Sequence, residues 1–168
     1  MATADVTFGF SCGRSKLDEY LVQRAASNNV AGWSATSVVL EGLRVVGFVT
    51  TVPAAVEAKL VRKVIRNLPG YPAPVLLLAR MGANLEDRGR GVGPLLMDVA
   101  YRGAVELADR FGCVGLLTHA KAAGEGQPDA RPYYAGLGFA VVEEPATEGD
   151  PTTMFLTMAK VREKLAAG

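Results

Sequence analysis

The chain has 168 residues, of which 49% are hydrophobic and 21% are charged, and its formal net charge is +1. This composition predicts a single folded domain over residues 1–168 and excludes a disordered chain. The small net charge excludes nucleic-acid binding through bulk charge, so such a role would need a local cationic patch. No apolar run approaches the ~20 residues of a membrane span, and the first residues lack signal-peptide features, so we expect a cytoplasmic protein.

The cysteine and histidine content argues against a metal centre. Cys12 and Cys113 lack metal-ligand spacing, and we expect both to be buried free thiols. His119 is the single histidine of the chain, which argues against a zinc site built on histidines.

In the first third of the chain, strand patterns alternate with one helical pattern. Ser15 is a suitable N-cap for a helix over residues 16–26, which carries its apolar side chains at helical spacing. The remaining predicted segments are a strand over 6–10, a loop over 27–32, a strand over 35–40, a break at 41–42 and a strand over 44–52. The short break predicts that the last two strands are antiparallel.

A cationic stripe follows the second of these strands. Pro53 suits the first position of a helix, and Lys59, Arg62, Lys63 and Arg66 then follow at i, i+3, i+4 and i+7. On a helix these four cations share one face without an acid among them. The stripe is either an ordinary solvated surface or a contact for a polyanion.

The middle of the chain predicts a βαβ unit. A proline-rich linker over 68–74 leads to an apolar strand over 75–80. An amphipathic helix begins near Val92 and ends at Gly112, and a buried strand covers 113–118. The strands of such a unit are parallel.

The last third begins with a glycine-rich loop over 120–129. Asp129 can cap a short helix that carries Tyr133 and Tyr134 and ends at residues 136–138. Two final strands are predicted over 139–142 and 153–158, and residues 160–168 are expected to fray.

The connection between strand 75–80 and the helix from Val92 contains Gly89, Gly91 and Gly93 in alternation with other residues. Such a turn uncovers backbone N–H groups at the positive end of a helix dipole, which suits a pyrophosphate. The alternative is a tight connection in which the glycines serve sterics alone.

Two motifs together resemble the GNAT superfamily of acyl-CoA N-acetyltransferases. They are Arg88-x-x-Gly91-x-Gly93 after a strand and Tyr134-x-x-x-Gly138-Phe139 much later. The resemblance implies a mixed α/β sheet of about six to seven strands flanked by helices, with two strands splayed apart at the acetyl-CoA site. It also implies that no metal is needed.

A narrower resemblance covers residues 10–158. The segments Phe10-x-Cys12-Gly13, Leu17-Asp18-x-Tyr20-Leu21, Val46-Gly47-Phe48-Val49-Thr50, Leu68-Pro-x-Tyr71-Pro and Leu77-Leu-Ala-Arg80-Met are similar to the acetyltransferase toxins of bacterial toxin–antitoxin pairs. The resemblance implies acetylation of the α-amino group of aminoacyl-tRNA and inhibition of translation. It also implies a homodimer and a small ribbon–helix–helix antitoxin.

The resemblance assigns a role to each candidate site residue. Tyr134 would protonate the leaving thiolate, the alternative being a core tyrosine, and Tyr133 would be the packing member of the pair. The backbone at Met81 and Ala83 would pair with the pantetheine and polarise the carbonyl. The full set of expected cofactor-binding residues is Met81, Ala83, Arg88, Gly89, Arg90, Gly91, Val92, Gly93 and Pro94, and the nucleic-acid contacts would be Lys59, Arg62, Lys63 and Arg66.

Two features depart from the toxin pattern. The segment over 121–128 is several residues longer than in the family, which leaves the acceptor preference open, and Pro132 directly precedes the two tyrosines.

No residue stands out as a base, which favours an α-amino acceptor because its pKa is only about 7.7–8.0. His119 is a candidate base or a structural histidine. Two other functions stay open: acetylation of a small amine or a protein N-terminus, and acyl-CoA binding without catalysis.

Overall fold

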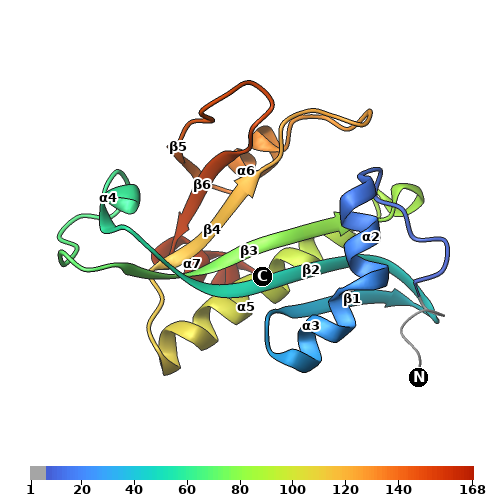
Figure 1. The fold of residues 1–168 in the computed structure, drawn as a ribbon. Helices are drawn as coiled ribbons and strands as arrows, with labels where there is room; N and C mark the ends of the chain where they lie inside the picture. Colours follow the sequence, from blue (N-terminus) through green and yellow to red (C-terminus); the bar gives the residue numbers. More distant parts are fainter. Residues whose placement is uncertain (1–6) are drawn as a thin grey trace. The chain divides into compact units, whose positions relative to one another are not determined.

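A computed structural model describes residues 7–168 (Figure 1). These residues divide into two compact units. The first unit contains residues 7–52 and 79–100, and the second contains 53–78 and 101–168. The strands form one mixed six-stranded sheet in the order β1-β2-β3-β4-β6-β5, so the predicted mixed α/β sheet is confirmed for these residues. The elements are α2 Ser15–Gln23, α3 Ala25–Ala31, β1 Ala35–Glu41, β2 Arg44–Val56, α4 Ala58–Val61, β3 Ala73–Ala83, the 3-10 helix η1 Leu85–Asp87, α5 Val92–Arg110, β4 Gly115–Ala120, α6 Arg131–Gly136, β5 Ala140–Glu143, β6 Thr152–Thr157 and α7 Met158–Ala167.

The first unit is built on the β1–β2 hairpin. The two strands are antiparallel, as predicted, and pair from Ala35 with Thr51 to Glu41 with Arg44. α2 buries its apolar face in a cluster with β2, in which Phe48 is fully buried and meets Phe10 edge-on at 5.7 Å. This cluster fixes the segment that precedes α2.

The second unit contains the parallel part of the sheet. β3 pairs with β4 in parallel from Leu76 with Leu116 onward, which confirms the predicted βαβ unit. β6 lies antiparallel between β4 and β5. The core of this unit contains Leu117 and Phe155 from the sheet and Val61 from α4.

Three predictions of local structure in the first unit are wrong. Thr7 to Phe10 form a turn rather than a strand, with Phe10 N–H donating to the Thr7 carbonyl at 3.1 Å, and the predicted first position of that strand lies outside the described residues. Ser15 does not cap α2, because the N-cap is Arg14 and no side chain caps it. The predicted loop over 27–32 is instead mostly α3, whose end is fixed where Asn29 exchanges hydrogen bonds with the backbone of Thr36 at 2.8 and 3.0 Å.

The helix expected from Pro53 is also wrong. β2 continues to Val56, and only the four residues of α4 are helical. The pairing of β1 with β2 ends at Thr51, so Pro53 lies past the last β1 residue and removes no hydrogen bond from that side of the ladder. The i, i+3, i+4 spacing of the cations therefore does not place them on one helical face.

The chain end forms α7, so the expected fraying is wrong as well. The Thr157 hydroxyl accepts the Lys160 N–H at 3.4 Å as an N-cap, and Val161 is fully buried. The buried Val161, the Thr157 cap and the ion pair between Arg162 and Asp109 thus hold this helix. Among the described residues, no helix is both long and apolar enough to cross a membrane.

Candidate active site

The glycine turn joins η1 to α5 with two residues in the left-handed region. Gly89 has φ +78° and Gly91 has φ +86°. A Cβ on either residue would meet no atom of the described chain within 4 Å. Backbone conformation, and not crowding, therefore requires glycine here, and the space over the turn is open to a ligand.

The turn delivers the start of a long helix. α5 has 19 residues, and the N–H groups of its first turn, at Val92 and Gly93, have no partner within the helix. Pro94 lacks an N–H and suits a first turn. Together with the helix dipole, this geometry is suited to an anion, and pyrophosphate binding at the turn stays a prediction.

Gly47 of β2 fixes the position of the helix start. A Cβ at Gly47 would lie 2.4 Å from Val92 Cγ1, so only glycine lets the strand and helix approach so closely. The sequence identifies Gly47 only as part of a family signature and does not predict this packing role.

A buried carboxylate supports the turn from below. The Asp87 side chain is 3% exposed. It accepts hydrogen bonds from Arg44 at 2.7 and 3.0 Å, from Arg90 at 2.6 Å and from Asn84 at 2.9 Å. Hydrogen bonds from Arg44 and Asn84 hold the pKa of Asp87 well below its usual range. This carboxylate is therefore ionised at any physiological pH.

The two arginines of the turn both have intramolecular partners. Arg90 binds Asp87 and also Glu41, whose carboxylate it meets at 2.5 Å. Arg88 is exposed, and its guanidinium donates to the Cys12 carbonyl at 2.8 Å. The structure thus brings the predicted cofactor residues 88–94 together in one turn, with Arg90 joined to acids of the same unit.

Met81 and Ala83 lie in the last residues of β3 and are half-buried. Gly82 stands between them, where a Cβ would approach Cys12 to 3.0 Å. Asn84 follows and donates its N–H to the Val46 carbonyl at 2.8 Å. The predicted pairing of Met81 and Ala83 with a pantetheine stays a prediction.

Tyr134 lies on α6 in the second unit and is 7% exposed. Its ring meets Tyr133 and Phe139 edge-on at 5.2 and 5.3 Å. Burial raises the pKa of Tyr134 to about 12, and a hydrogen bond with the Thr118 hydroxyl lowers it in part. The phenol therefore stays protonated at physiological pH. Tyr133 is 42% exposed, so the expectation that it is the packing member of the pair is wrong.

His119 belongs to the opposite face of β4 from Thr118. Neighbouring side chains of a strand alternate in direction, so the face that serves Tyr134 is not the face of His119. His119 is exposed, and its Nδ1 lies 3.0 Å from the Thr153 hydroxyl. These contacts fit a structural histidine.

The long segment after β4 forms an ordered hairpin (Figure 1). Gly124 and Gln127 exchange backbone hydrogen bonds at 3.1 and 2.8 Å across two residues with positive φ, Glu125 at +52° and Gly126 at +74°. The Ala130 N–H closes its base by donating to the Lys121 carbonyl. Asp129 accepts the Arg131 N–H at 2.8 Å just before α6, but the N-cap is Ala130 and no side chain caps the helix, so the predicted capping role of Asp129 is wrong.

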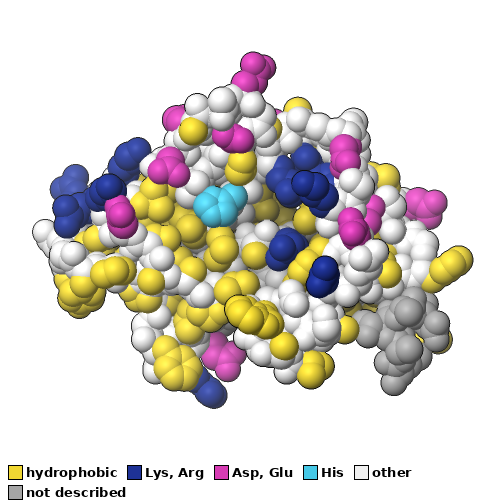
Figure 2. Space-filling view, viewed as in Figure 1, with side chains coloured by type: hydrophobic (Ala, Val, Ile, Leu, Met, Phe, Trp, Pro, Cys, Tyr) yellow, Lys and Arg dark blue, Asp and Glu magenta, His cyan; other side chains and the backbone are white. Residues whose placement is uncertain are grey.

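The four predicted cations lie on α4 and the turns after it, and Figure 2 shows Lys and Arg side chains gathered where Figure 1 places α4. Lys59 pairs with Glu57 at 2.8 Å, and Lys63 donates to the Val142 carbonyl at 2.8 Å. Arg62 and Arg66 are exposed. The segment remains cationic, although its geometry is not the predicted helical stripe.

Neither cysteine suits nucleophilic catalysis. Cys12 and Cys113 are free and buried, as predicted. Burial raises the pKa of the Cys12 thiol to about 11 and also raises that of Cys113. Within residues 7–168, no group of histidine, cysteine and acidic side chains is arranged to hold a metal ion.

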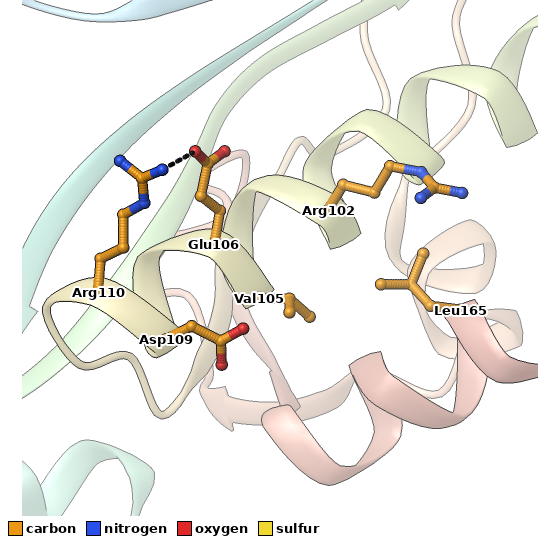
Figure 3. A pocket seen from close by; sticks show the side chains of 6 residues that line it. All are labelled: Arg102, Val105, Glu106, Asp109, Arg110 and Leu165. Carbon is orange, nitrogen blue, oxygen red and sulfur yellow. Dashed lines mark ion pairs between the residues drawn. The ribbon is translucent and has the colours of Figure 1, made fainter.

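A separate cavity of ≈ 380 Å³ lies on α5 and α7 (Figure 3). Its lining is formed by Arg102, Val105, Glu106, Asp109, Arg110 and Leu165. Arg110 pairs with Glu106 at 3.8 Å, and Asp109 pairs with Arg162 at 2.9 Å. The cavity contains none of the predicted site residues and is not the candidate active site.

The sequence does not predict the roles of Asp87, Arg44, Glu41 and Thr118. Arg44 and Asp87 are 43 positions apart, so no local spacing could pair them. The weak signal available is a pair of acids, Glu86 and Asp87, directly before the glycine- and arginine-rich turn.

No protein-family model matches this chain. A search of curated proteins finds a tRNA-acetylating toxin of Mycobacterium tuberculosis that is 34% identical over 163 residues, which cover 96% of this chain and 92% of that protein. Among solved structures, AtaT complexed with acetyl-methionyl-tRNAfMet is similar with a TM-score of 0.74 at 18% identity, over 95% of this chain and 91% of that one.

A mutant of the toxin AtaT, bound to the C-terminus of the antitoxin AtaR and to acetyl-CoA, is similar with a TM-score of 0.70. The identity is 16%, and the match covers 93% of this chain and 88% of that one. Structural likeness at such identities establishes a shared fold, whereas the curated relative exceeds that level over nearly the whole length of both proteins. The chain therefore belongs to the family of tRNA-acetylating toxins.

Proposed function

We propose that this protein is an acetyl-CoA-dependent N-acetyltransferase that acetylates the α-amino group of aminoacyl-tRNA and so inhibits translation. The observation that carries the proposal is the 34% identity to a tRNA-acetylating toxin over 96% of the chain. The acetylated methionyl-tRNA in the AtaT complex supports an α-amino acceptor, because acetyl-methionyl-tRNA carries its acetyl group on that nitrogen.

The glycine turn would bind the pyrophosphate of acetyl-CoA. The left-handed glycines and the first N–H groups of α5 support this assignment. Arg88 would contribute charge, and the backbone of Met81 and Ala83 would pair with the pantetheine. An amine cleaves a thioester without a metal, so backbone and side-chain groups of the protein suffice for the reaction.

The reaction is a direct transfer. The amine nitrogen attacks the thioester carbon, the C–S bond breaks, and the proton released from nitrogen passes to solvent. Tyr134 would donate its phenolic hydrogen to the sulfur as negative charge develops there. Since its pKa of about 12 exceeds the ~8.5 of an ordinary thiol, Tyr134 acts chiefly as a hydrogen-bond donor.

The acceptor would need no dedicated base. An α-amino group has a pKa of about 7.7–8.0, so a useful fraction is neutral near pH 7.5. A lysine side chain, whose pKa is near 10.4, would need a dedicated base far more. The engagement of His119 by Thr153 supports this choice of acceptor, because it leaves the histidine in a structural role.

The cationic segment after β2 would bind the tRNA backbone. Arg62 and Arg66 are the leading candidates, since Lys59 and Lys63 already have partners within the chain. Removal of one cation that neutralises a phosphate should reduce the salt dependence of binding to a structured RNA by roughly 0.7–0.9 in slope. Replacing Arg62 and Arg66 with Gln should therefore flatten the slope more than replacing Lys59 and Lys63. A slope equal to that of wild type in both variants would exclude the segment.

We further propose an antitoxin of the ribbon–helix–helix type, a homodimeric toxin and a cytoplasmic location. The complex of AtaT with the C-terminus of AtaR supports an antitoxin partner. An aminoacyl-tRNA substrate is a cytoplasmic molecule, which supports the location.

The direct test is transfer of labelled acetyl groups to charged tRNA, with deacylated tRNA as the control. Label on charged tRNA alone is the expected result. Absence of label across a full set of aminoacyl-tRNAs, combined with turnover of free amines, would replace this function with that of a small-amine acetyltransferase. Acetyl-CoA binding without any turnover would leave only a binding module.

A further inference from the structure

A closed salt-bridge network lies beneath the glycine turn and links three segments of the first unit. Asp87 is its centre and Arg44 and Arg90 are its two cations. Glu41 contacts the outer side of both arginines, at 2.7 and 2.5 Å. The end of the β1–β2 hairpin, η1 and the turn itself are therefore tied together.

The network is electrically neutral, with two carboxylates and two guanidinium groups. Asn84 completes it by donating to Asp87, and its own side-chain oxygen accepts the Ser11 N–H at 2.9 Å. Because Asp87 is almost fully buried, its hydrogen bonds come from protein groups. A bidentate arginine–carboxylate pair restricts orientation as well as distance.

We propose that Asp87 is a positioning residue for acyl-CoA, a role that rests on the proposed function. It holds Asn84, which precedes the turn, and Arg90, which lies within it between Gly89 and Gly91. These two left-handed glycines on either side of Arg90 are thereby kept in the conformation that presents the N–H groups of α5 to the pyrophosphate. Asp87 does not itself touch the cofactor.

A positioning role and charge alone predict opposite changes in acetyl-CoA affinity for one substitution. A carboxylate close to a polyanionic ligand repels it, so on charge alone Asp87→Asn should tighten acetyl-CoA binding. If Asp87 holds the turn, the same substitution should weaken binding, because the amide cannot accept two charged arginines.

Replacing a residue that supports a binding group commonly changes the affinity by an amount that a binding measurement can resolve. Loss of an outer-shell partner of a metal ligand typically costs about 10–100-fold in affinity, and a binding group displaced by ~0.5 Å loses its productive geometry. We therefore expect Asp87→Asn to raise the Kd for acetyl-CoA about tenfold. The effect should fall on binding and on KM for acetyl-CoA, with kcat at saturating cofactor little changed.

Glu86 offers a matched control within the same 3-10 helix. It carries the same charge, is exposed and takes no part in the network. Glu86→Gln should leave the Kd unchanged or lower it slightly. Titration of acetyl-CoA into wild type, Asp87→Asn and Glu86→Gln by calorimetry compares the three directly.

A thermal melt would show whether Asp87→Asn misfolds. A second variant tests the proposal independently of that outcome. Glu41 lies at the exposed rim of the network, so Glu41→Gln should fold normally. Positioning predicts weaker binding here too, about two- to threefold, whereas charge alone predicts tighter binding. Wild-type protein that fails to bind acetyl-CoA would refute the proposed function itself. Wild type that binds, with Asp87→Asn and Glu41→Gln binding equally or more tightly, would refute the positioning role.

Discussion

The glycine turn and α6 carry the two halves of the proposed chemistry, and they are supported by different forces. The turn rests on charges, with Asp87 accepting Arg44 and Arg90. α6 rests on aromatic packing, with Tyr134 held edge-on against Phe139 and Tyr133. Acid should therefore weaken the first support, whereas loss of apolar volume should weaken the second.

The same contrast separates cofactor binding from the chemical step. The turn offers backbone donors and would act before any bond breaks. The buried phenol of Tyr134 would act only when charge develops on sulfur. Substitutions in the two regions should thus alter different kinetic constants, and the following predictions use that difference.

The largest effect is expected from Tyr134→Phe. Removal of the phenolic hydrogen-bond donor should lower kcat by about 10²–10³-fold and leave the Kd for acetyl-CoA unchanged. Single-turnover acetyl transfer and calorimetry measure the two quantities. Tyr133→Phe is the matched control and should retain most activity. Equal losses in both variants would break the distinction between the tyrosines.

Phe139→Ala should remove the packing that holds α6. Phe139 is buried, and truncation of a buried phenylalanine costs about 3–5 kcal/mol in the free energy of unfolding. Urea denaturation measures this loss, which should be insensitive to pH between 5 and 8. A loss below about 1 kcal/mol would show that aromatic packing does not support the helix.

Gly91→Ala should strain the turn without any clash. Gly91 has φ +86°, and a non-glycine residue costs roughly 1–2 kcal/mol in the left-handed region. Acetyl-CoA binding should weaken together with stability. Gly124→Ala is the comparison, because Gly124 lies in the hairpin after β4 and a Cβ there also meets no atom within 4 Å. Unchanged binding in Gly91→Ala would separate the turn from the cofactor.

Acid should weaken the support of the glycine turn, at Asp87, and leave the aromatic packing of α6 unchanged. The pKa of Asp87 is lowered on folding, so its contribution to stability is complete above its ordinary pKa of 3.8 and is lost as pH falls through the folded-state pKa. Asp87→Asn should therefore reduce the change in stability between pH 5 and pH 2. Circular dichroism during acid unfolding of both proteins measures this. Parallel curves would contradict an ionised Asp87 at the centre of the network.

The smallest effect is expected from His119→Ala. Its side chain is exposed and contacts Thr153, so stability should change by less than about 0.5 kcal/mol and kcat by about twofold at most. A fall of kcat comparable to that of Tyr134→Phe would identify His119 as the base.

Local rules predict the parts of the molecule that local geometry determines. The glycine turn, the start of α5 near Val92 and its end at Gly112 follow from backbone preferences within a few residues. Most of the predicted strands of the sheet are present within a few residues of their expected bounds, since apolar runs and turns delimit them.

Long-range contacts explain what could not be predicted. The partners of Asp87 come from the β1–β2 hairpin, and only the folded chain brings them together. The prediction that the four cations share one helical face is wrong because helical spacing alone cannot tell where a strand such as β2 ends. α7 is not predicted because the contacts that hold it, the burial of Val161 and the ion pair of Arg162 with Asp109, form only in the folded chain.

The central claim is that the acetyl group reaches the α-amino nitrogen of an aminoacyl-tRNA. Charged tRNA would be incubated with acetyl-CoA and protein, digested with ribonuclease, and its terminal aminoacyl-adenosine analysed by mass spectrometry. We predict N-acetyl-aminoacyl-adenosine with wild type and a trace of it with Tyr134→Phe. Unmodified aminoacyl-adenosine from wild-type reactions that still acetylate free amines would contradict the account.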